Sequence, residues 1–594
     1  MIFYRVDLDD LHGHHYRVTL TVPQPGEGLE LALPVWIPGS YLVREFARHL
    51  SGVQAMQGRT AWDVQALDKA RWRVSRPAGA PASRAALTVT WRVYAFDTSV
   101  RTAFLDDRRG FFNGTGLLLR VVGREAQPQR LSLGRLPAHW EVATAMPAAP
   151  EGPARGESGA WLAADYDELV DHPFELGSFW RGHFSAGGVP HEVVVAGAWP
   201  RFDGDRLLKD TQRICAAQIA FWHGADAPPR SAPFGRYVFL INAVGDGYGG
   251  LEHRASTALL TNRADLPVQG AGHGAAASDG YIGLLGLISH EYFHSWNVKR
   301  LKPAEFATLD YQQENYTRLL WFFEGVTSYY DDLMLRRAGL IDAPRYLKLL
   351  GRSVAALAAT PGRQVQSVAE ASFDAWVKYY RPDENTPNAT VSYYIKGALV
   401  ALALDLSLRQ RGHSLDDVMR RLWRDSGGGA IDEAAIGAAL QAVAGRALQR
   451  TLRAWVHGTD ELPLAELLAA TGVTCRDERA GWAASLGLKL SEGPVSGVQV
   501  KSVLAGSAAA AAGISAGDEL LAVDGWRIRR LDEALAWVGR DAPFDLLLAR
   551  DQRVLSRRVQ PSAAAGGYAT TPALALHDRP ARHALARRRA WIDA

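Results

Sequence analysis

The sequence predicts a multidomain α+β protein, with an N-terminal β-sandwich, a mostly helical central domain and a small C-terminal β-rich domain. Three observations support this fold class. With 594 residues, the chain is too long for one hydrophobic core, and its length suggests about three to five domains. Its first third alternates apolar and polar residues as strands do, whereas apolar residues recur at helical spacing after residue 280. Strand-like runs return after residue 480.

The composition is that of an ordinary soluble protein, with 47% hydrophobic and 22% charged residues and a formal charge of +3. Such a small net charge favours neither nucleic acid nor a membrane as a partner. The two cysteines, Cys215 and Cys475, lie far apart, which excludes a disulfide framework and argues against a zinc site built on thiolates. Because the sequence shows no secretory signal and no long apolar run, we expect a cytoplasmic protein.

Residues 1–175 are predicted to form the N-terminal β-rich domain. Residues 16–22 and 86–94 alternate as half-buried strands do, and the segment 34–41 illustrates the Pro and Gly residues that punctuate this region. Short strands with one apolar face pack into two layers, which gives a sandwich.

Residues 176–475 are predicted to form a second domain. It opens with strand-like runs at 191–196 and 236–242 and then becomes mostly helical, with the apolar spacing of helices over 316–337 and 393–409. This second domain carries the residues of greatest chemical interest.

Residues 480–560 are predicted to form a third, smaller domain. Residues 506–513 predict a short helix closed by a glycine, and 519–524 predict a strand that ends in an Asp524-Gly525 turn. Residues 561–594 are rich in Ala and Arg with little periodicity, and we expect them to form a solvated C-terminal tail.

The sequence His-Glu-Tyr-Phe-His at 290–294 follows an apolar helical stretch and matches the pattern H-E-x-x-H. Residues four apart lie on one face of a helix, so His290 and His294 can bind one zinc ion together. Glu291 then lies close enough to act as a general base on water at the metal. The pattern predicts a zinc hydrolase, and above all a peptidase.

A zinc peptidase of this kind needs a third protein ligand, and Glu324 is the candidate. It lies in a strongly apolar segment, where a buried carboxylate is costly unless a cation compensates its charge. The alternatives are a salt bridge to a buried arginine or a solvent-exposed helix face. Asp331, seven residues further on, is a candidate acceptor for the N–H of a ligand histidine, or else a solvated helix acid.

Together, several motifs resemble the glycyl aminopeptidase family, which are zinc metallopeptidases with a C-terminal PDZ domain. These motifs are the run from His290 into Ser-Trp-Asn-Val-Lys-Arg-Leu-Lys-Pro, the segment around Glu324, Gly-Gly-Leu-Glu-His at 249–253, Pro-Gly-Ser-Tyr at 38–41, and the closing segment. The resemblance implies a thermolysin-like catalytic domain over 176–475, a PDZ domain over 480–560 and one zinc ion. It implies removal of N-terminal residues from peptides, with Gly or Ala favoured.

One feature departs from the pattern of the larger group of related zinc aminopeptidases. In that group eighteen residues separate the second histidine from the glutamate ligand, whereas here residues 295–323 intervene. The structural role of this longer insertion is not predicted by the motifs.

The resemblance also implies residues that bind the substrate. Gly249, Gly250 and Glu252 lie where related aminopeptidases have an edge strand whose glutamate binds the free amine of the substrate. The alternative is that Glu252 pairs with Arg254. Tyr394, in the sequence Tyr-Ile-Lys-Gly, matches a tyrosine that donates to the oxyanion; the neighbouring Tyr393 is the other possibility, and a packed aromatic residue is the alternative for either.

Three functional hypotheses follow from these residues. The first is a zinc aminopeptidase, and the second is a zinc endopeptidase to which the PDZ groove presents substrates. The third is a PDZ peptide-binding protein with a vestigial zinc site. The predicted partners are peptide substrates and a peptide or protein C-terminus at the PDZ groove, where residues 485–488 are the candidate carboxylate-binding loop, unless the groove is blocked by packing. Nothing in the sequence predicts an oligomeric state.

Overall fold

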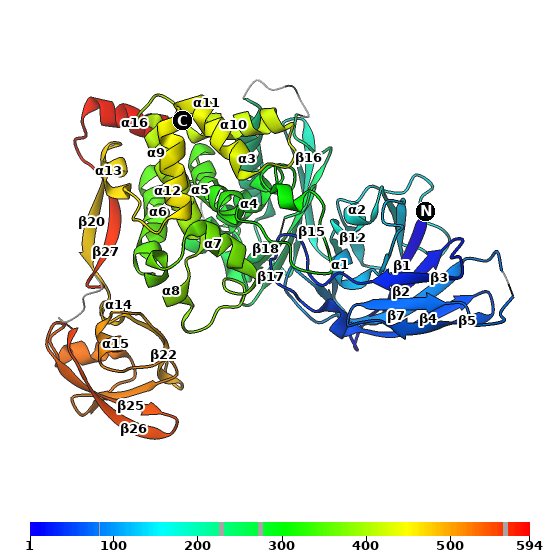
Figure 1. Cartoon of the computed structure of the whole chain (residues 1–594), viewed down its shortest axis with the longest axis horizontal. Coiled ribbons are helices and arrows are strands. Elements are labelled where there is room, and N and C mark those ends of the chain that lie inside the picture. The colour runs from blue at the N-terminus through cyan, green and yellow to red at the C-terminus, as the bar shows by residue number, and fades with distance from the viewer. Residues whose placement is uncertain (82, 225–227, 229–230, 271–276, 562–567, 594) are drawn as a thin grey trace. The chain divides into compact units, whose positions relative to one another are not determined.

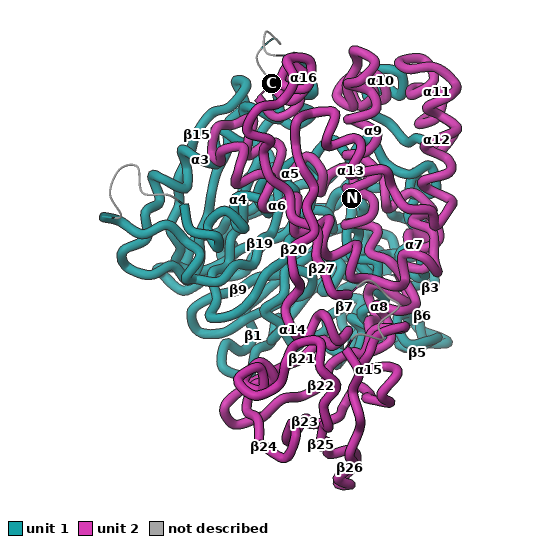
Figure 2. Tube along the Cα trace, turned by 90° about the vertical axis from the view of Figure 1, so that its left-hand side faces the viewer, with its two compact units in different colours: residues 1–316, 423–431 teal, residues 317–422, 432–594 magenta. Residues whose placement is uncertain are grey.

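The computed structural model describes residues 1–594 except 82, 225–227, 229–230, 271–276, 562–567 and 594 (Figure 1). The chain divides into two compact units, shown in Figure 2. Unit 1 comprises residues 1–316 and 423–431, and unit 2 comprises residues 317–422 and 432–594. The division at residue 316 falls inside the region predicted as a single catalytic domain, so the H-E-x-x-H motif lies in unit 1 and Glu324 in unit 2.

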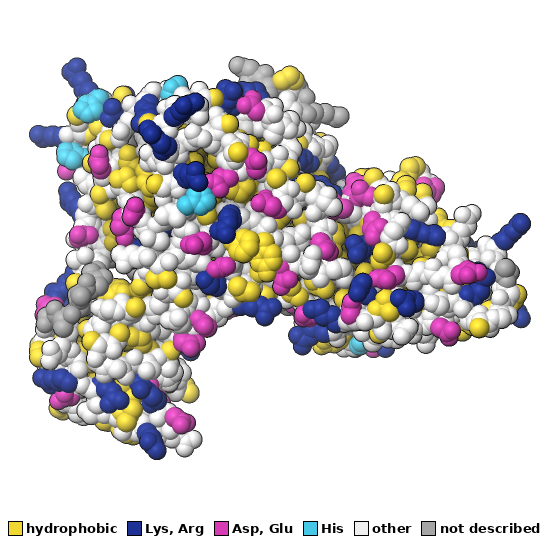
Figure 3. Space-filling model, in the orientation of Figure 1, with side chains coloured by type: hydrophobic (Ala, Val, Ile, Leu, Met, Phe, Trp, Pro, Cys, Tyr) yellow, Lys and Arg dark blue, Asp and Glu magenta, His cyan; other side chains and the backbone are white. Residues whose placement is uncertain are grey.

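The surface carries charges of both signs. Figure 3 shows Lys and Arg side chains interspersed with Asp and Glu side chains over the visible face, as the small net charge leads one to expect. Among the described residues, none of the helices combines the length and the apolar character that crossing a bilayer requires.

The N-terminal part of unit 1 is β-rich. Its strands are β1 (Ile2–Asp10), β2 (His15–Val22), β3 (Gly28–Ala32), β4 (Leu50–Gln57), β5 (Thr60–Ala66), β6 (Arg71–Ser75), β7 (Leu87–Tyr94), β8 (Ala103–Leu105), β9 (Arg109–Phe112), β10 (Arg120–Val121), β11 (Gln129–Leu133), β12 (Glu141–Ala143), β13 (Gly159–Ala163) and β14 (Phe174–Gly177). Its short helices are η1 (Phe46–His49), α1 (Gly114–Leu117) and α2 (Tyr166–Val170).

These strands form two sheets around one apolar core. The larger sheet has the order β10-β3-β6-β5-β4-β7-β2-β1-β11-β13, and the smaller has the order β12-β14-β9-β8. In β2 the buried side chains are Tyr16, Val18, Leu20 and Val22, so the alternation read from the sequence is the alternation of core and solvent. The prediction of an N-terminal sandwich is confirmed.

The remainder of unit 1 is built around a five-stranded sheet. Its strands are β15 (Trp180–Ala186), β16 (Val189–Ala196), β17 (Tyr237–Val244), β18 (Gly249–Glu252) and β19 (Ser256–Asn262), in the order β15-β16-β17-β19-β18. Its helices are α3 (Gly204–His223), η2 (Arg263–Asp265), α4 (Asp279–Phe293) and η3 (Ala304–Phe306).

Strand β18 is the edge of this sheet and runs antiparallel to β19. Helix α4 packs against both strands, which places the H-E-x-x-H motif beside the sheet edge. Leu251 of β18 belongs to the same apolar core as the sandwich, so the edge strand packs against the N-terminal domain. An edge strand has unpaired backbone groups and can accept an extended peptide.

Unit 2 begins with a helical layer. Its helices are the π-helical turn η4 (Trp321–Gly325), α5 (Val326–Arg337), α6 (Ala343–Ala358), η5 (Pro361–Gln364), α7 (Val368–Phe373), η6 (Asp374–Trp376), α8 (Thr386–Ala389), α9 (Tyr393–Arg409), α11 (Glu433–Ala444), α12 (Arg446–His457) and α13 (Leu464–Ala469), together with α10 (Leu415–Ser426), whose residues from 423 on belong to unit 1. Helix α9 matches the predicted helix at 393–409 and is buried on nearly all sides, as the central helix of a bundle must be. The helix predicted over 316–337 begins only at Trp321.

The C-terminal part of unit 2 contains a small β domain. Its elements are β20 (Val473–Arg479), α14 (Trp482–Ser485), β21 (Leu488–Gly493), β22 (Gly497–Val503), α15 (Ala508–Ala511), β23 (Glu519–Val523), β24 (Trp526–Arg527), η7 (Leu531–Ala536), β25 (Phe544–Arg550), β26 (Arg553–Val559), β27 (Thr570–Leu576) and α16 (Arg582–Ile592). The sheet order is β21-β22-β23-β25-β26, with β24 paired to β23. Asp524 and Gly525 both have positive φ, which fits the predicted tight turn.

The region expected to be a solvated tail is instead structured where it is described. β27 pairs antiparallel with β20, from Val473 opposite Leu576 to Arg479 opposite Thr570, and it packs on α6. Helix α16 follows and ends with Trp591 and Ile592 buried. The sequence signal was weak because β27 does not alternate regularly and because α16 is rich in arginine, with no regular apolar spacing. Residues 562–567 and 594 of this region lie outside the described residues.

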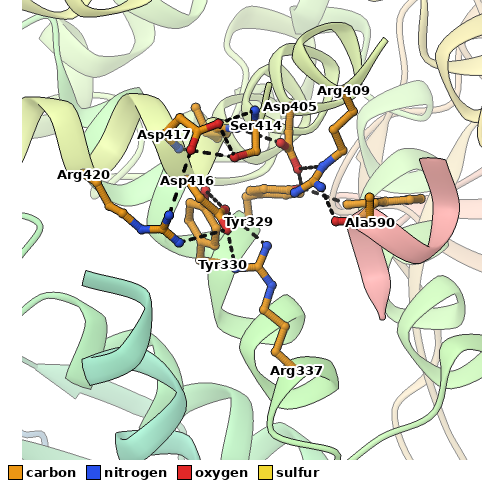
Figure 4. A network of polar contacts seen from close by, with 12 residues as sticks. Tyr329, Tyr330, Arg337, Asp405, Arg409, Ser414, Asp416, Asp417, Arg420 and Ala590 are labelled. Carbon is orange, nitrogen blue, oxygen red and sulfur yellow. Dashed lines mark hydrogen bonds and ion pairs between the residues drawn. The ribbon is translucent and has the colours of Figure 1, made fainter. Parts of the chain in front are cut away.

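Helix α16 is fixed to the helical layer by polar contacts. The indole N–H of Trp591 donates to the Tyr329 hydroxyl at 3.0 Å, and that hydroxyl donates to Asp405 at 2.5 Å. Figure 4 shows the surrounding network, in which Arg409 contacts both Asp405 and the carbonyl of Ala590. Trp591 is 0% exposed, so it combines full apolar burial with a satisfied polar group.

We expect Trp591→Ala to lower the free energy of unfolding by about 3–5 kcal/mol, because it empties a fully buried site and removes the hydrogen bond to Tyr329. Urea unfolding followed by far-UV circular dichroism measures this change. Trp526 is 68% exposed, and Trp526→Ala is therefore the matched control, with an expected change within about 0.5 kcal/mol. Equal losses in the two variants would show that α16 does not stabilise the helical layer.

Candidate active site

The last turn of α4 presents the H-E-x-x-H side chains. The helix starts at a serine cap, where Ser278 Oγ accepts from the N–H of Tyr281 at 3.1 Å. At its other end, the Nε2 atoms of His290 and His294 lie 3.0 Å apart, as the four-residue spacing predicts. His294 is 1% exposed and Glu291 is 5% exposed, so both side chains lie in an environment that is nearly free of water.

The tautomer of His294 supports metal binding. Its Nδ1 lies 2.8 Å from the carbonyl oxygen of Asn297, and a carbonyl can only accept, so Nδ1 carries the proton. Nε2 of His294 then carries the lone pair of the ring, and it lies 3.0 Å from Nε2 of His290. Two ring nitrogens at this separation are well placed to bind one cation, and neutral imidazole is a preferred ligand of zinc. The two histidines therefore fit a zinc ion.

The edge strand β18 lies directly against Glu291. A methyl group built at Gly250 would be only 2.1 Å from Glu291 Oε1, so a side chain at this position would displace the Glu291 carboxylate. Glu252 follows on the same strand and is 4% exposed. Glu252, Glu291 and His294 offer ligand atoms that all lie within 4.8 Å of one another. The structure thus brings these three predicted site residues together within unit 1.

The N-terminal domain contributes directly to the surroundings of Glu252. Gly39 has φ of +91°, and a side chain there would meet Glu252 Oε2 at 2.5 Å. The Pro-Gly-Ser-Tyr segment at 38–41 therefore passes directly over the Glu252 carboxylate. The sequence singled out this segment but gave no indication that it would contact Glu252.

A small pocket of about 50 Å³ lies beside Glu252, entirely within unit 1. Its lining residues include Trp36, Tyr41, Phe306 and Tyr311, which are bulky aromatic side chains. Part of the wall comes from the insertion that follows His294, through Val298, Lys299, Lys302, Phe306, Leu309 and Tyr311. Residues of the longer insertion therefore line the space next to Glu252.

The predicted alternative for Glu252 was an ion pair with Arg254. Arg254 instead contacts Asp167 and Asp171, and within the described part of the chain the Glu252 carboxylate makes no ion pair or hydrogen bond. Asp171 also forms an ion pair with Lys299, whose Nζ lies 3.0 Å from Asp171 Oδ1. Burial raises the pKa of Asp171, but the charges of Lys299 and Arg254 outweigh this and hold it well below its usual range. This ion network leaves Glu252 available for a ligand.

In unit 2, Glu324 lies in the π-helical turn η4 and is 2% exposed. The turn packs backbone to backbone on α9, since a methyl group at Gly325 would meet the Cα of Gly397 at 2.5 Å. Gly397 is the glycine of the Tyr-Ile-Lys-Gly motif, so this contact fixes Glu324 relative to Tyr394 one turn earlier. π-Helical turns are often found at functional sites. No pattern in the sequence predicted this turn.

Tyr394 and Tyr393 differ in accessibility. Tyr393 is 0% exposed, whereas Tyr394 is partly exposed and its hydroxyl lies 3.3 Å from that of Tyr380. Burial, and next the nearby Glu324 carboxylate, raise the pKa of Tyr394 well above its usual range, so its phenol keeps its proton and can donate.

Asp331 lies on α5, partly buried, and its carboxylate accepts from the N–H of Asp332. The acceptor at Nδ1 of His294 is the Asn297 carbonyl. A role for Asp331 beside His290 stays a prediction.

The loop at 485–488 differs from its expected role. The backbone N–H groups of Ser485, Leu486 and Gly487 donate to the carbonyls of Gly481, Trp482 and Ala484. They are engaged in and around the short helix α14, so they cannot hold a carboxylate without breaking these bonds. The adjacent strand β21 is an edge of its sheet.

Three sequence families match the chain. The family described as M61 glycyl aminopeptidase matches residues 283–400, the peptidase M61 N-terminal domain matches residues 3–178, and the PDZ domain matches residues 477–536. No curated protein matches the chain significantly.

Among solved structures, the chain is similar to an aminopeptidase N family protein from Idiomarina loihiensis. The two share 36% sequence identity and a TM-score of 0.90, with 100% of each chain covered. A more distant similarity is to an M1 zinc metallopeptidase from Deinococcus radiodurans, at 16% identity and a TM-score of 0.46, covering 78% of this chain and 94% of that one.

The histidine pair, the adjacent glutamates, the match to the M61 family and the similarity to the Idiomarina loihiensis protein define a zinc metallopeptidase of the aminopeptidase class. The chain belongs to the M61 glycyl aminopeptidase family, with its N-terminal domain and a C-terminal PDZ domain. The predicted family and enzyme class are thereby confirmed.

Proposed function

We propose that this zinc aminopeptidase removes N-terminal Gly and Ala residues from peptides, with His290, His294 and Glu324 as the ligands of one zinc ion. The proposal is carried by the position of Glu252 within 4.8 Å of Glu291 and His294 ligand atoms. An acid at that position can bind a free α-amine directly beside the first peptide bond. It favours removal of the terminal residue over internal cleavage.

The role of each residue in the reaction follows from its charge and from its position in the site. A zinc ion held by these three residues would supply Lewis acidity at the scissile carbonyl and at the attacking water. Glu291 takes the proton from the attacking water and delivers it to the leaving amine. Tyr394 donates its phenolic proton in a hydrogen bond to the oxyanion, and its partial exposure supports Tyr394 over the fully buried Tyr393 for this role.

Glu324 is assigned as the third ligand because its carboxylate is buried in an apolar helical turn. A buried anion is costly unless a cation compensates it, and a divalent metal is the strongest available compensator. Two imidazoles and one carboxylate form the ligand set of many catalytic zinc sites, which keep a fourth position for water.

The preference for Gly and Ala is supported by the pocket beside Glu252. A cavity of about 50 Å³ has room for a few water molecules or a small side chain. The aromatic walls formed by Trp36, Tyr41 and Tyr311 are rigid and well packed, so a large side chain would overlap them. Gly249 and Gly250 at the start of β18 leave the backbone of the strand accessible to pair with the peptide.

The PDZ domain is assigned a second, separate peptide site. An extended peptide would add to the free edge of β21 by main-chain hydrogen bonds. The engaged N–H groups at 485–487 favour pairing along the strand over capture of a chain terminus. The cytoplasmic location stays a prediction.

An assay of amino-acid chromogenic amides tests the function. We expect turnover of the glycyl and alanyl amides to exceed that of leucyl and phenylalanyl amides by at least about tenfold, a typical discrimination for a small pocket. A chelator should remove activity, and added Zn²⁺ should restore it.

Blocked peptides separate the alternatives. Internal fragments of N-acetylated peptides, read by mass spectrometry, would establish an endopeptidase instead. Absence of turnover with every amide, in protein that retains peptide binding at the PDZ domain, would indicate a vestigial zinc site.

A further inference from the structure

A side-chain amide connects the PDZ domain to the helix that carries Tyr394. Asn388 lies on the short helix α8, six residues before Tyr394. Its Nδ2 donates to the carbonyl of Val503 at 2.9 Å, and its Oδ1 accepts from the N–H of Ala505 at 2.8 Å. The two bonds use both ends of the amide, so its orientation is fixed and neither bond can be kept if it is reversed. All these residues belong to unit 2.

The PDZ side of this contact is the loop between β22 and α15. Leu504, which lies between the two bonded residues, donates its N–H to the carbonyl of Gly487 at 2.8 Å. Gly487 directly precedes β21, the edge strand assigned to peptide binding. The hydroxyl of Tyr568 also donates to the Ala505 carbonyl, at 2.6 Å. The loop to which Asn388 is hydrogen-bonded is therefore itself hydrogen-bonded to the residue that precedes the peptide-binding strand.

On the other side, the chain from α8 to α9 is short and closely held. The N–H of Thr390 donates to Thr386 at 3.1 Å, and Ser392 Oγ caps α9 by accepting from Ile395 at 3.3 Å. A methyl group at Gly362 would lie 2.1 Å from the Thr390 carbonyl, so η5 presses directly on this segment. Because the segment is short and held at both ends, a displacement of α8 is transmitted to the start of α9 and its first-turn residue Tyr394, in addition to the packing of Gly397 on Gly325.

We propose that Asn388 is a positioning residue through which the PDZ domain holds Tyr394 in place for oxyanion stabilisation, so that occupancy of the edge strand β21 acts on the rate of peptide hydrolysis. The inference rests on the proposed role of Tyr394. Asn388 contacts neither the ligand histidines nor Tyr394 in any interaction of the described residues, and it acts only through the backbone. The class of ligand that would regulate the rate is an extended peptide.

The test measures kcat and KM on an alanyl chromogenic amide, a substrate with no extended peptide that could pair with β21. We expect Asn388→Ala to lower kcat about tenfold and to leave KM within twofold, since a displacement of Tyr394 affects transition-state binding most. Gln499→Ala is the matched control. It removes a side-chain amide from the same PDZ domain, at a residue whose amide hydrogen-bonds, among the described residues, with Ser496 alone, and should leave kcat unchanged.

A double-mutant cycle with Tyr394→Phe isolates the coupling. In the Tyr394→Phe background, Asn388→Ala should cause no further loss in kcat. Thermal unfolding of each variant shows whether the fold is retained.

Two outcomes would overturn the inference. One is an unchanged kcat in Asn388→Ala when Tyr394→Phe loses activity, which removes the coupling but keeps the proposed function. The other is an equal further loss in the Tyr394→Phe background, which makes the effect of Asn388 independent of Tyr394. If Tyr394→Phe itself keeps full activity, the proposed role of Tyr394 fails, and with it the premise of this coupling.

Discussion

The variant Glu291→Gln is expected to lose turnover by about 10²–10⁴-fold while it keeps its zinc, because glutamine preserves the shape of glutamate but cannot take a proton from water. The site permits an isosteric change and little else, since the strand at Gly250 approaches Glu291 Oε1 so closely. The measurement is kcat on the alanyl amide together with the metal content of the purified variant.

The exposed Glu305 provides the matched control, and Glu305→Gln should retain normal turnover and normal zinc. Near-normal rates in Glu291→Gln would show that another group is the base. Loss of zinc together with activity would instead assign Glu291 a role in building the metal site.

The variant Glu252→Ala is expected to lower kcat/KM for substrates with a free amine by roughly 30-fold to several thousandfold. This corresponds to the about 2–5 kcal/mol that is lost when one partner of a buried charge pair is removed. Glu252 is 4% exposed and makes no competing ion pair among the described residues, so its carboxylate meets the substrate ammonium in a poorly solvated site.

N-acetylated substrates give the internal comparison, because they lack the ammonium and should lose little in Glu252→Ala. Asp246→Ala, which removes an exposed acid from the loop before β18, should change neither rate. Equal losses on free and acetylated substrates would contradict the amine-binding role.

Local patterns predicted much of this protein. Helical spacing placed His290 and His294 on one face of α4 and gave the bounds of α9, because both features depend on neighbours within a few residues. Alternation predicted the sandwich strands for the same reason. The family resemblance added Glu252 and Tyr394, which no periodicity would have selected.

The parts that were missed depend on contacts between distant segments. The π-helical turn at Glu324 contains Gly325, whose backbone packs on that of Gly397, a residue far away in the sequence. The covering of Glu252 by Gly39 is likewise a long-range contact. β27 was missed because its pairing partner, β20, lies on the other side of the PDZ domain in the sequence.

That last pairing has a consequence for biosynthesis. A ribosome makes β27 and α16 after the PDZ domain, yet the indole of Trp591 completes the packing around Tyr329, 262 residues earlier. A nascent chain interrupted anywhere within the PDZ domain therefore lacks the segment that closes its helical layer. Such a fragment would expose apolar surface on α5 and α9. Chaperones and proteases recognise exposed apolar surface, so we expect a prematurely terminated chain to be degraded.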